Sequence, residues 1–442
     1  MTREPDPAAC DPAYLNTVDE LYHDEWAARK LLRIRWLAKS IAHFWPGGHP
    51  TRLVHVAGTN GKGSTCRLLE AALGLTGRAG SMTNPHLFDF AERCSIGGVP
   101  LSHAAWARLW REVVRPHSLD RAESDPARCL SFAEAGILLA LHAFAEHGVR
   151  WGIVETGVGG RYAPSMALRP ALCVLTNVGH DHPATLGRAV WQRALEKAGI
   201  ARPGVPLLTG ATGQALAMVQ RVAEQEGAPL HVVDDDVVSA TRRVAASSGQ
   251  QVEDVPEHGW RNLALALACA RLAEPALDEG ATLADMLAVR PLPGRFWQPR
   301  ENLVADVAHN PDKLAALAAQ LEQIHPGRPL LLVFGVSRDR PLAPMLAPLA
   351  GRTARIILTG ASYAGRDPRE LEAECRAAFP HLPAQVVTDP CEALAQAERE
   401  RLHPELVVIT GSAYTLDQAL NPDPFLQRLN AEYGRRGGLL KS

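Results

Sequence analysis

Apolar residues along this chain gather into short runs that alternate with stretches of helical periodicity. In the N-terminal half, strand-like runs cover residues 53–57, 151–155, 171–176 and 207–209, and helical spacing covers 14–44, 66–73, 131–147, 195–200 and 262–272. Residues 240–255 are polar and predict a small hairpin or loop. Alternation of apolar strands with helices predicts an α/β fold with a largely parallel sheet.

A proline- and glycine-rich segment, residues 291–295, divides this half from a second α/β pattern. The second pattern predicts strands at 303–307, 330–334, 354–358, 384–387 and 406–410, and helices near 312–324, 342–350, 368–378, 390–401 and 415–434. We therefore predict two domains, 1–295 and 296–442, with a hinge over 291–300.

Composition narrows the class of protein. The chain has 442 residues, of which 46% are apolar and 21% charged, as in ordinary globular proteins. A formal charge of −2 argues against nucleic acid and anionic membranes as partners. Its eight scattered cysteines form no CxxC pair, which argues against structural zinc or a disulfide framework. A polar N-terminus and short apolar runs predict a cytoplasmic enzyme.

The most informative stretch joins the strand at 53–57 to the helix at 66–73. Between them lie Gly58, Thr59, Asn60, Gly61, Lys62, Gly63, Ser64 and Thr65. A glycine-rich turn from a strand into a helix lets backbone N–H groups surround a phosphate, and the helix N-terminus adds partial positive charge. Lys62 is suited to the β- and γ-phosphates, and the hydroxyl of Ser64 or Thr65 to Mg²⁺. We interpret the stretch as an ATP site, although Gly63 departs from the common GxxxxGK[ST] spacing.

Two further segments follow predicted strands. Glu155 ends the strand at 151–155 and precedes a glycine-rich turn, so its carboxylate is a candidate Mg²⁺ ligand. His180, Asp181 and His182 follow the strand at 171–176. These residues could form a transition-metal site, but a single HxH lacks a third ligand motif, and magnesium chemistry with phosphates explains them more simply.

These segments, in this order, resemble the folylpolyglutamate synthase and dihydrofolate synthase family, within the Mur ligase superfamily. The resemblance runs from about residue 14 to the C-terminus. The matching motifs are His55 to Ser64, Asn84 to Leu87, Glu92-Arg93, Glu155 to Arg161, Asp181-His182, Glu196 to Ile200, Pro293 to Arg295, Asp306 with Ala308 to Pro311, Phe334-Gly335 and Gly411-Ser412.

The resemblance implies a P-loop NTPase-like N-terminal domain, of the Mur ligase central type, and a smaller Rossmann-like C-terminal domain. It implies that Ser64, Glu155 and His182 place two Mg²⁺ ions, and that Lys197 is carbamylated and becomes a ligand. It also implies that ATP contacts Asn262, Arg295 and Asp306, and that His309 lies near the γ-phosphate or the incoming amino acid. The implied substrate-binding residues are His86, Arg93, Arg161, Ala163 and Ser412.

The implied reaction converts a carboxylate into an acyl phosphate, which the amine of glutamate then attacks, releasing ADP and phosphate. Lys62 and magnesium would neutralise the developing charge. Closure about the 291–300 hinge would exclude water and protect the acyl phosphate. The partners expected are small molecules only, and the enzyme is expected to be a monomer.

The chain departs from the family on the acceptor side. After Arg161 the family's L-D-A-T-N is replaced by Tyr162 to Met166, so Ala163 stands where the family has an aspartate. Asn84 replaces a serine, and Val307 replaces a glycine. Near residue 30 the family's G-L-E-R-I lacks its glycine here.

The sequence thus leaves the acceptor open. It is either a folate or dihydropteroate, or another carboxylic acid in specialised metabolism. A nucleotide-binding protein without ligase activity is a third hypothesis, which the presence of Lys62, Glu155, His182 and Lys197 disfavours. A P-loop kinase or GTPase does not account for the second domain.

Overall fold

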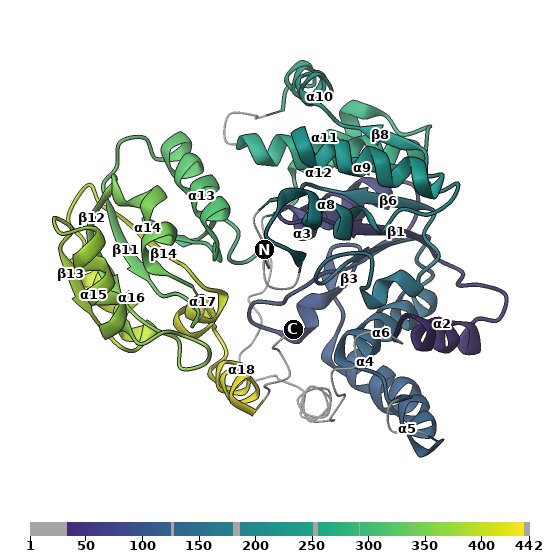
Figure 1. Ribbon diagram of the computed structural model, residues 1–442, viewed down its shortest axis with the longest axis horizontal. Helices are drawn as coiled ribbons and strands as arrows, with labels where there is room; N and C mark the ends of the chain where they lie inside the picture. The colour runs from purple at the N-terminus through teal and green to yellow at the C-terminus, as the bar shows by residue number, and fades with distance from the viewer. Residues whose placement is uncertain are drawn as a thin grey trace. The chain divides into compact units, whose positions relative to one another are not determined.

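The structure, a computed structural model, describes residues 33–124, 128–179, 186–250, 255–290, 292–338 and 340–436 (Figure 1). It divides into two compact units. The N-terminal unit runs to Arg290 without Leu87–Asp89, and the C-terminal unit consists of Pro291 onward together with Leu87–Asp89. The sequence prediction put the division at 295/296 instead. Among the described helices, none is long and apolar enough to cross a membrane.

The N-terminal unit is built on an eight-stranded sheet of order β4-β3-β2-β5-β1-β6-β7-β8. Its strands β2, β5, β1, β6, β7 and β8 are parallel, and β3 and β4 form an antiparallel edge. The strands are β1 (Arg52–Ala57), β2 (Ala79–Met82), β3 (Cys94–Ile96), β4 (Val99–Pro100), β5 (Trp151–Glu155), β6 (Leu172–Leu175), β7 (Leu207–Thr209) and β8 (Leu230–Val232).

The helices of this unit cover both faces of the sheet. They are α2 (Arg33–Phe44), α3 (Lys62–Gly74), α4 (His103–Leu109), α5 (Arg115–Ser124), α6 (Phe132–Glu146), α8 (Val190–Ala198), α9 (Gly213–Glu226), α10 (Asp235–Ser247), α11 (Glu257–Ala273) and α12 (Glu279–Leu287), with short 3₁₀ turns η1 (Phe90–Arg93) and η4 (Pro164–Ala167) and a π-helical turn η2 (Trp110–Val114). Along β6, Leu172 and Val174 pack with α3 and α11, whereas Cys173 and Leu175 pack with α8 and α9. This alternation buries the strand on both faces.

The C-terminal unit has a six-stranded sheet of order β13-β12-β11-β14-β10-β9, which is parallel except that β9 runs antiparallel to β10. Its elements are β9 (Trp297–Arg300), β10 (Leu303–Ala305), β11 (Leu330–Phe334), β12 (Thr353–Leu358), β13 (Ala384–Val386), β14 (Leu406–Thr410), α13 (Pro311–Ile324), α14 (Leu342–Ala350), α15 (Pro368–Ala378), α16 (Pro390–Glu400), α17 (Ala413–Leu420) and α18 (Pro424–Arg436). Helices α13 and α14 pack on one face and α16 on the other.

The segment Leu87–Asp89, which we call the strap, packs in the core of the C-terminal unit. The ring of Phe88 lies edge-to-face with that of Trp297, at a centroid distance of 5.7 Å. Its carbonyl oxygen accepts hydrogen bonds from Nδ2 of Asn421 (3.3 Å) and of Asn430 (3.1 Å). Leu87 is buried beside Gly294. The chain therefore enters this unit once before its main segment begins.

The prediction of two α/β units with largely parallel sheets is confirmed, but two local predictions were wrong. Residues predicted as a hairpin or loop at 240–255 belong in part to the helix α10, because Val238, Thr241 and Ala245 form a buried stripe at helical spacing. The helix predicted at 415–434 is two helices, because Pro422 and Pro424 interrupt it. The helix expected over 14–32 lies outside the described residues.

A glycine pair fixes how α6 meets the sheet. Gly80 on β2 and Gly152 on β5 lie opposite one another in the ladder, and the ring of Phe144 covers both. A Cβ atom would come within 2.8 Å of the ring at Gly80 and within 2.7 Å at Gly152. The absent side chains therefore make room for the aromatic ring.

We predict that Gly152→Ala lowers the free energy of unfolding by about 1–3 kcal/mol, because the new methyl group collides with Phe144 in a packed core. Phe144→Leu alone also destabilises, through lost packing. The double variant should lose less than the sum of the two, because the smaller side chain accepts the methyl group. Urea unfolding of the four proteins measures this coupling, and strictly additive losses would contradict the proposed contact.

Candidate active site

The turn that leads from β1 into α3 needs glycine at two positions. Gly58 and Gly61 have positive φ angles, of 144° and 78°. A Cβ atom on Gly58 would lie 1.9 Å from Oγ1 of Thr176, and one on Gly61 would lie 2.3 Å from Oδ1 of Asn262. These contacts explain why the loop is glycine-rich, since both backbone conformation and space exclude a side chain. They also bring Asn262, on α11, against the turn.

A seam of hydrogen bonds fixes the loop to the segment that follows β6. The amides of Thr59 and Asn60 donate to the backbone oxygen and to Oδ1 of Asn177, each at 3.0 Å. Oγ1 of Thr176 donates to the carbonyl of Asn60 at 2.7 Å. The loop is thus preformed by two carboxyl-terminal strand ends, the edge at which parallel α/β sheets bind ligands.

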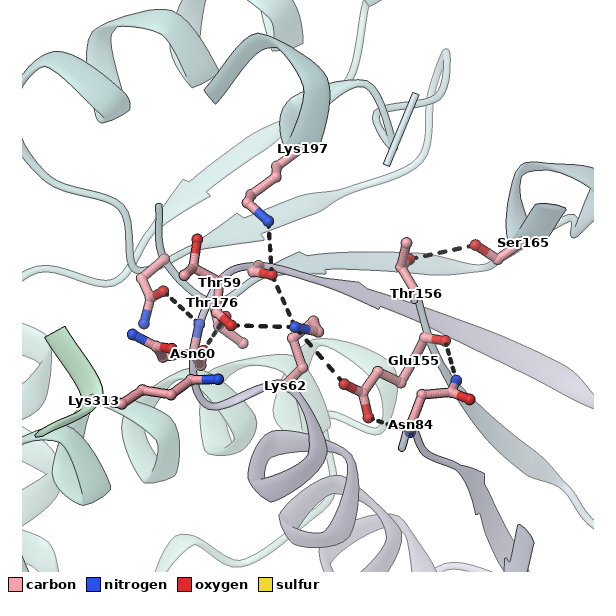
Figure 2. Close-up of polar contacts among 12 residues, drawn as sticks. Thr59, Asn60, Lys62, Asn84, Glu155, Thr156, Ser165, Thr176, Lys197 and Lys313 are labelled. Carbon is pink, nitrogen blue, oxygen red and sulfur yellow. Dashed lines mark hydrogen bonds and ion pairs between the residues drawn. The ribbon is translucent and has the colours of Figure 1, made fainter. Parts of the chain in front are cut away.

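Two lysines converge on one carbonyl oxygen of the loop. Nζ of Lys62 and Nζ of Lys197 both donate to the oxygen of Gly58, each at 3.1 Å (Figure 2). Lys62 also donates to the oxygen of Thr59 at 3.2 Å and lies 3.9 Å from Oε1 of Glu155. Lys197, near the end of α8, is almost completely buried. The structure therefore brings Lys62, Lys197 and Glu155 together beside the loop.

Asn84 holds the carboxylate of Glu155 from the other side. Its backbone amide donates to Oε2 at 2.9 Å, and its Nδ2 donates to the backbone oxygen of Glu155 at 3.4 Å (Figure 2). Sequence reasoning noted Asn84 only as a replacement for serine. Its contact with Glu155 depends on the pairing of β2 with β5, which residue type alone does not reveal.

Arg93 organises the loop that contains His86. Its Nε donates to Nδ1 of His86 at 2.8 Å and its guanidinium donates to Oδ1 of Asn84. The same guanidinium lies 5.4 Å from the ring centroid of Phe90 and 5.0 Å from that of Phe132. His86 and Arg93 are thus in contact, and Arg93 links this loop to Asn84, which binds Glu155.

The loop at 161–166 is held by a backbone hydrogen bond of Arg161 and by the side chain of Ser165. The amide of Arg161 donates to the oxygen of Glu196 at 2.8 Å, and Ala163 is buried at the start of η4. Oγ of Ser165 and Oγ1 of Thr156 lie 2.9 Å and 2.7 Å from Nε2 of His55.

The imidazole of His55 is fully buried on β1. Its Nδ1 has no hydrogen-bond partner among the described residues. Burial, assisted by the charge of Arg202, lowers the pKa of His55 to about 3. His55 is therefore a neutral link between β1 and Ser165 of the loop at 161–166.

The oxygen donors near the loop fit a hard cation. Ser64 lies in the first turn of α3, and Oγ1 of the buried Thr65 and Oδ1 of Asn60 have no hydrogen-bond partner in the part of the chain that is described. Together with the carboxylate of Glu155, these are the ligand types that Mg²⁺ prefers. No group of three His, Cys, Asp or Glu side chains suited to a metal occurs within the described ranges. His182 and its neighbours His180 and Asp181 lie outside them.

The C-terminal unit gathers the other predicted residues around the end of β10. The carboxylate of Asp306 accepts hydrogen bonds from the amides of Phe296 and Ala308, each at 2.7 Å. Burial raises the pKa of Asp306, and the nearby Arg295 and the two amides oppose that effect. The hydroxyl of Ser412 caps α17 by accepting from the amide of Tyr414 at 3.2 Å. Asp306 thus fixes the turn through 292–296, and Ser412 serves a helix start.

His309 follows in the same turn. Its Nδ1 lies 2.8 Å from the carbonyl oxygen of Val307, and its Nε2 lies 3.1 Å from Nζ of Lys313. Sequence reasoning did not single out Lys313. Its position three residues after Asn310, at a predicted helix start, was the only available signal.

Comparison with known proteins adds independent findings. The model of the family described as "Mur ligase, glutamate ligase domain" matches residues 295–413. The chain is 30% identical over 401 residues to the dihydrofolate synthase/folylpolyglutamate synthase of Bacillus subtilis (strain 168). This alignment covers 83% of this chain and 90% of that protein.

Solved structures are similar to this one over nearly the whole chain. Mycobacterium tuberculosis folylpolyglutamate synthase complexed with ADP is similar with a TM-score of 0.80 and 25% identity, covering 96% of this chain and 99% of that one. A bifunctional folylpolyglutamate synthase/dihydrofolate synthase from Yersinia pestis, complexed with AMPPNP and a Mn ion, is similar with a TM-score of 0.74 and 26% identity, covering 94% and 98%.

We predict that Gly58→Ala abolishes measurable nucleotide binding, because the methyl group would collide with Thr176 and the residue would hold an unfavourable φ. Gly74→Ala is the matched control, since a Cβ at that position, at the end of α3, meets nothing within 4 Å. Titration calorimetry with ADP and Mg²⁺ compares the two variants. Equal affinity in both would contradict the close packing inferred for the loop.

The low pKa of His55 predicts a pH-dependent stability. The unfolded chain binds a proton near pH 6.5 and the folded chain only near pH 3, so stability is complete above pH 6.5 and falls as the pH decreases through this window. His55 alone should contribute a slope that approaches about 1.4 kcal/mol per pH unit as the pH falls below 6.5. Chemical denaturation of wild type and His55→Asn between pH 7.5 and 5.5 measures this contribution. Parallel pH profiles would show that His55 does not carry it.

Proposed function

Because this chain belongs to the family of folylpolyglutamate and dihydrofolate synthases, we propose that it is an ATP-dependent, ADP-forming ligase that couples glutamate to a folate-type carboxylate. The observation that carries the proposal is the preformed loop from Gly58 to Thr65, with Lys62 and Glu155 paired beside it. A carboxylate reacts with an amine only after activation, here as an acyl phosphate, and this site has the features needed to hold the phosphate donor.

For the nucleotide, we assign the phosphates to the loop amides and to Lys62. Lys62 now donates to loop carbonyls, and this flexible ammonium can exchange them for phosphate oxygens. We assign three further residues to the rest of the ATP molecule. They are Asn262 in the N-terminal unit, and Arg295 and Asp306 in the C-terminal unit. The chain's own contribution to catalysis is positioning and charge neutralisation, the usual means in phosphoryl transfer.

Magnesium fits the oxygen donors of the site. Ser64 and Glu155, together with His182 and a modified Lys197, would hold the two ions that the family implies. Bound there, the metal would neutralise charge on the phosphate oxygens. Asn84 keeps Glu155 in place through one hydrogen bond to its carboxylate and one to its backbone oxygen.

Carbamylation of Lys197 is part of the proposal. In the unmodified chain, two ammonium groups share the oxygen of Gly58. Reaction of the Lys197 amine with carbon dioxide would remove one of these positive charges and create a carboxylate-like ligand. Intact-mass analysis after incubation with bicarbonate and Mg²⁺ tests the modification directly.

For the acceptor, we propose a folate or dihydropteroate bound near His86, Arg93 and Arg161. The named relatives favour such an acceptor over another carboxylic acid. Ala163 cannot accept a hydrogen bond through its side chain, so the pterin end must be held by other groups. We place the glutamate near Ser412 and His309. A cytoplasmic location and a monomeric state remain predictions.

The test is ADP release by the purified full-length protein with ATP, Mg²⁺ and glutamate, with dihydropteroate, tetrahydrofolate or a panel of small carboxylic acids as acceptor. We expect turnover only when a pterin acceptor and glutamate are both present. Lys62→Ala should lower kcat/KM by a factor of about 100 or more, because it removes a cation that stabilises the transition state. Lys39→Met, on the exposed face of α2, is the control and should leave turnover unchanged.

Two outcomes would overturn parts of this proposal. ADP release that needs neither acceptor nor glutamate would contradict the ligase assignment. Turnover with another carboxylic acid but with no pterin would contradict the folate assignment and show that the loop at 161–166 serves a different substrate.

A further inference from the structure

The C-terminal unit contains a contact between a lysine and a histidine that the proposed mechanism does not use. Nζ of Lys313 lies 3.1 Å from Nε2 of His309, and Nδ1 of the same ring lies 2.8 Å from the carbonyl oxygen of Val307. The backbone amide of Lys313 donates to Oδ1 of Asn310, which caps α13. The cap therefore fixes the backbone of Lys313, and the contact with His309 fixes the position of its ammonium group.

Elementary hydrogen bonding specifies the state of the imidazole. A carbonyl oxygen can only accept, so the ring proton must be on Nδ1 and point to Val307. An ammonium group can only donate, so Nε2 must present its lone pair to Lys313. Both contacts are satisfied together only by the neutral ring with its proton on Nδ1.

The charges around the ring support this state. Burial, followed by the positive charge of Lys313, holds the pKa of His309 well below its usual range, and Arg295 and Arg340 act in the same direction. The carbonyl of Val307 opposes them. The carboxylate of Asp306 is next to this group, but it is engaged by two backbone amides. His309 therefore carries no charge, and the positive charge of this cluster is on Lys313, Arg295 and Arg340.

The position of Lys313 is unfavourable for the helix itself. A cation in the first turn of α13 opposes the helix dipole, whose positive end is at that turn, whereas the neighbouring Asp312 complements it. Nδ2 of the fully buried Asn310 also has no hydrogen-bond partner within the described residues. An ammonium, a helix N-terminus and an unused amide donor together favour an anion.

We propose that Lys313 contacts an anionic oxygen of a reactant, and that His309 is a positioning residue that holds the Lys313 ammonium ready for it. This inference rests on the proposed ligase function, which supplies two anions of this chemistry, a phosphoryl oxygen of ATP and a carboxylate oxygen of glutamate. It also revises the role expected for His309. A ring whose Nε2 lone pair is covered by an ammonium, and whose Nδ1 proton is bound by a carbonyl, is poorly placed to give or take a proton.

One measurement needs no turnover. In full-length protein labelled with ¹⁵N-histidine, and assigned by comparison with His309→Gln, the ring of His309 should show the neutral form protonated on Nδ1, without titration from pH 8 to pH 5.5. In Lys313→Met its pKa should rise, because one neighbouring positive charge is gone. A charged ring near pH 7, or a proton on Nε2, in the wild type would overturn the proposal even if no acceptor supports ligation.

The second measurement uses the ligation assay. Lys313→Met should raise the KM of one anionic reactant about 10- to 100-fold at pH 8, the range expected for losing a hydrogen bond to a charged group. A rise for ATP identifies the phosphoryl oxygen, and a rise for glutamate identifies the carboxylate. Lys313→Arg should recover part of the loss, and Lys39→Met should behave as wild type.

Recovery of the KM by Lys313→Arg but not by Lys313→Met separates this role from a structural one. Unchanged KM values for both ATP and glutamate would overturn the proposal. If wild-type protein shows no ligation at all, the proposed function has failed, and the histidine spectra alone decide the contact.

Discussion

The close approach of the P-loop backbone to the segment after β6 is the constraint on which the N-terminal unit depends. Gly58 and Gly61 leave no room for a Cβ atom against Thr176 and Asn262. Because the loop lies so near, Asn177 accepts from the amides of Thr59 and Asn60, and Thr176 donates to the carbonyl of Asn60. The conformation of the loop is thus preformed, so little conformational entropy would be lost on binding the phosphate that we propose for it.

Each unit contains a lysine that donates to a neutral acceptor. In the N-terminal unit Lys62 and Lys197 donate to the carbonyl oxygen of Gly58, and in the C-terminal unit Lys313 donates to an imidazole nitrogen. A neutral acceptor orients an ammonium without cancelling its charge, whereas a carboxylate at the same distance would neutralise it. Glu155 stands further from Lys62, at 3.9 Å.

The elements were predicted well where the pattern of the chain is local. Continuous apolar runs at 53–57, 151–155 and 330–334 became β1, β5 and β11, because strands buried on both faces need no alternation. Helix α10 was missed because its buried stripe has only three members, one of them the polar Thr241, within a polar segment. The P-loop was recognised since its glycines, lysine and hydroxyls are consecutive.

The partners of those residues were not predictable in the same way. Asn84 reaches Glu155 only because β2 pairs with β5, and Arg93 meets Asn84 and His86 only after η1 has folded. The neutral state of His309 likewise depends on the turn that leads from Val307 to Lys313.

The strap, Leu87–Asp89, limits how the chain can be divided into fragments. A fragment starting at Pro291 would lack Leu87 and Phe88 from its core, and a fragment ending at Arg290 would present those apolar side chains to water. Neither unit is a continuous segment, so each is expected to need the other half of the chain in order to remain soluble.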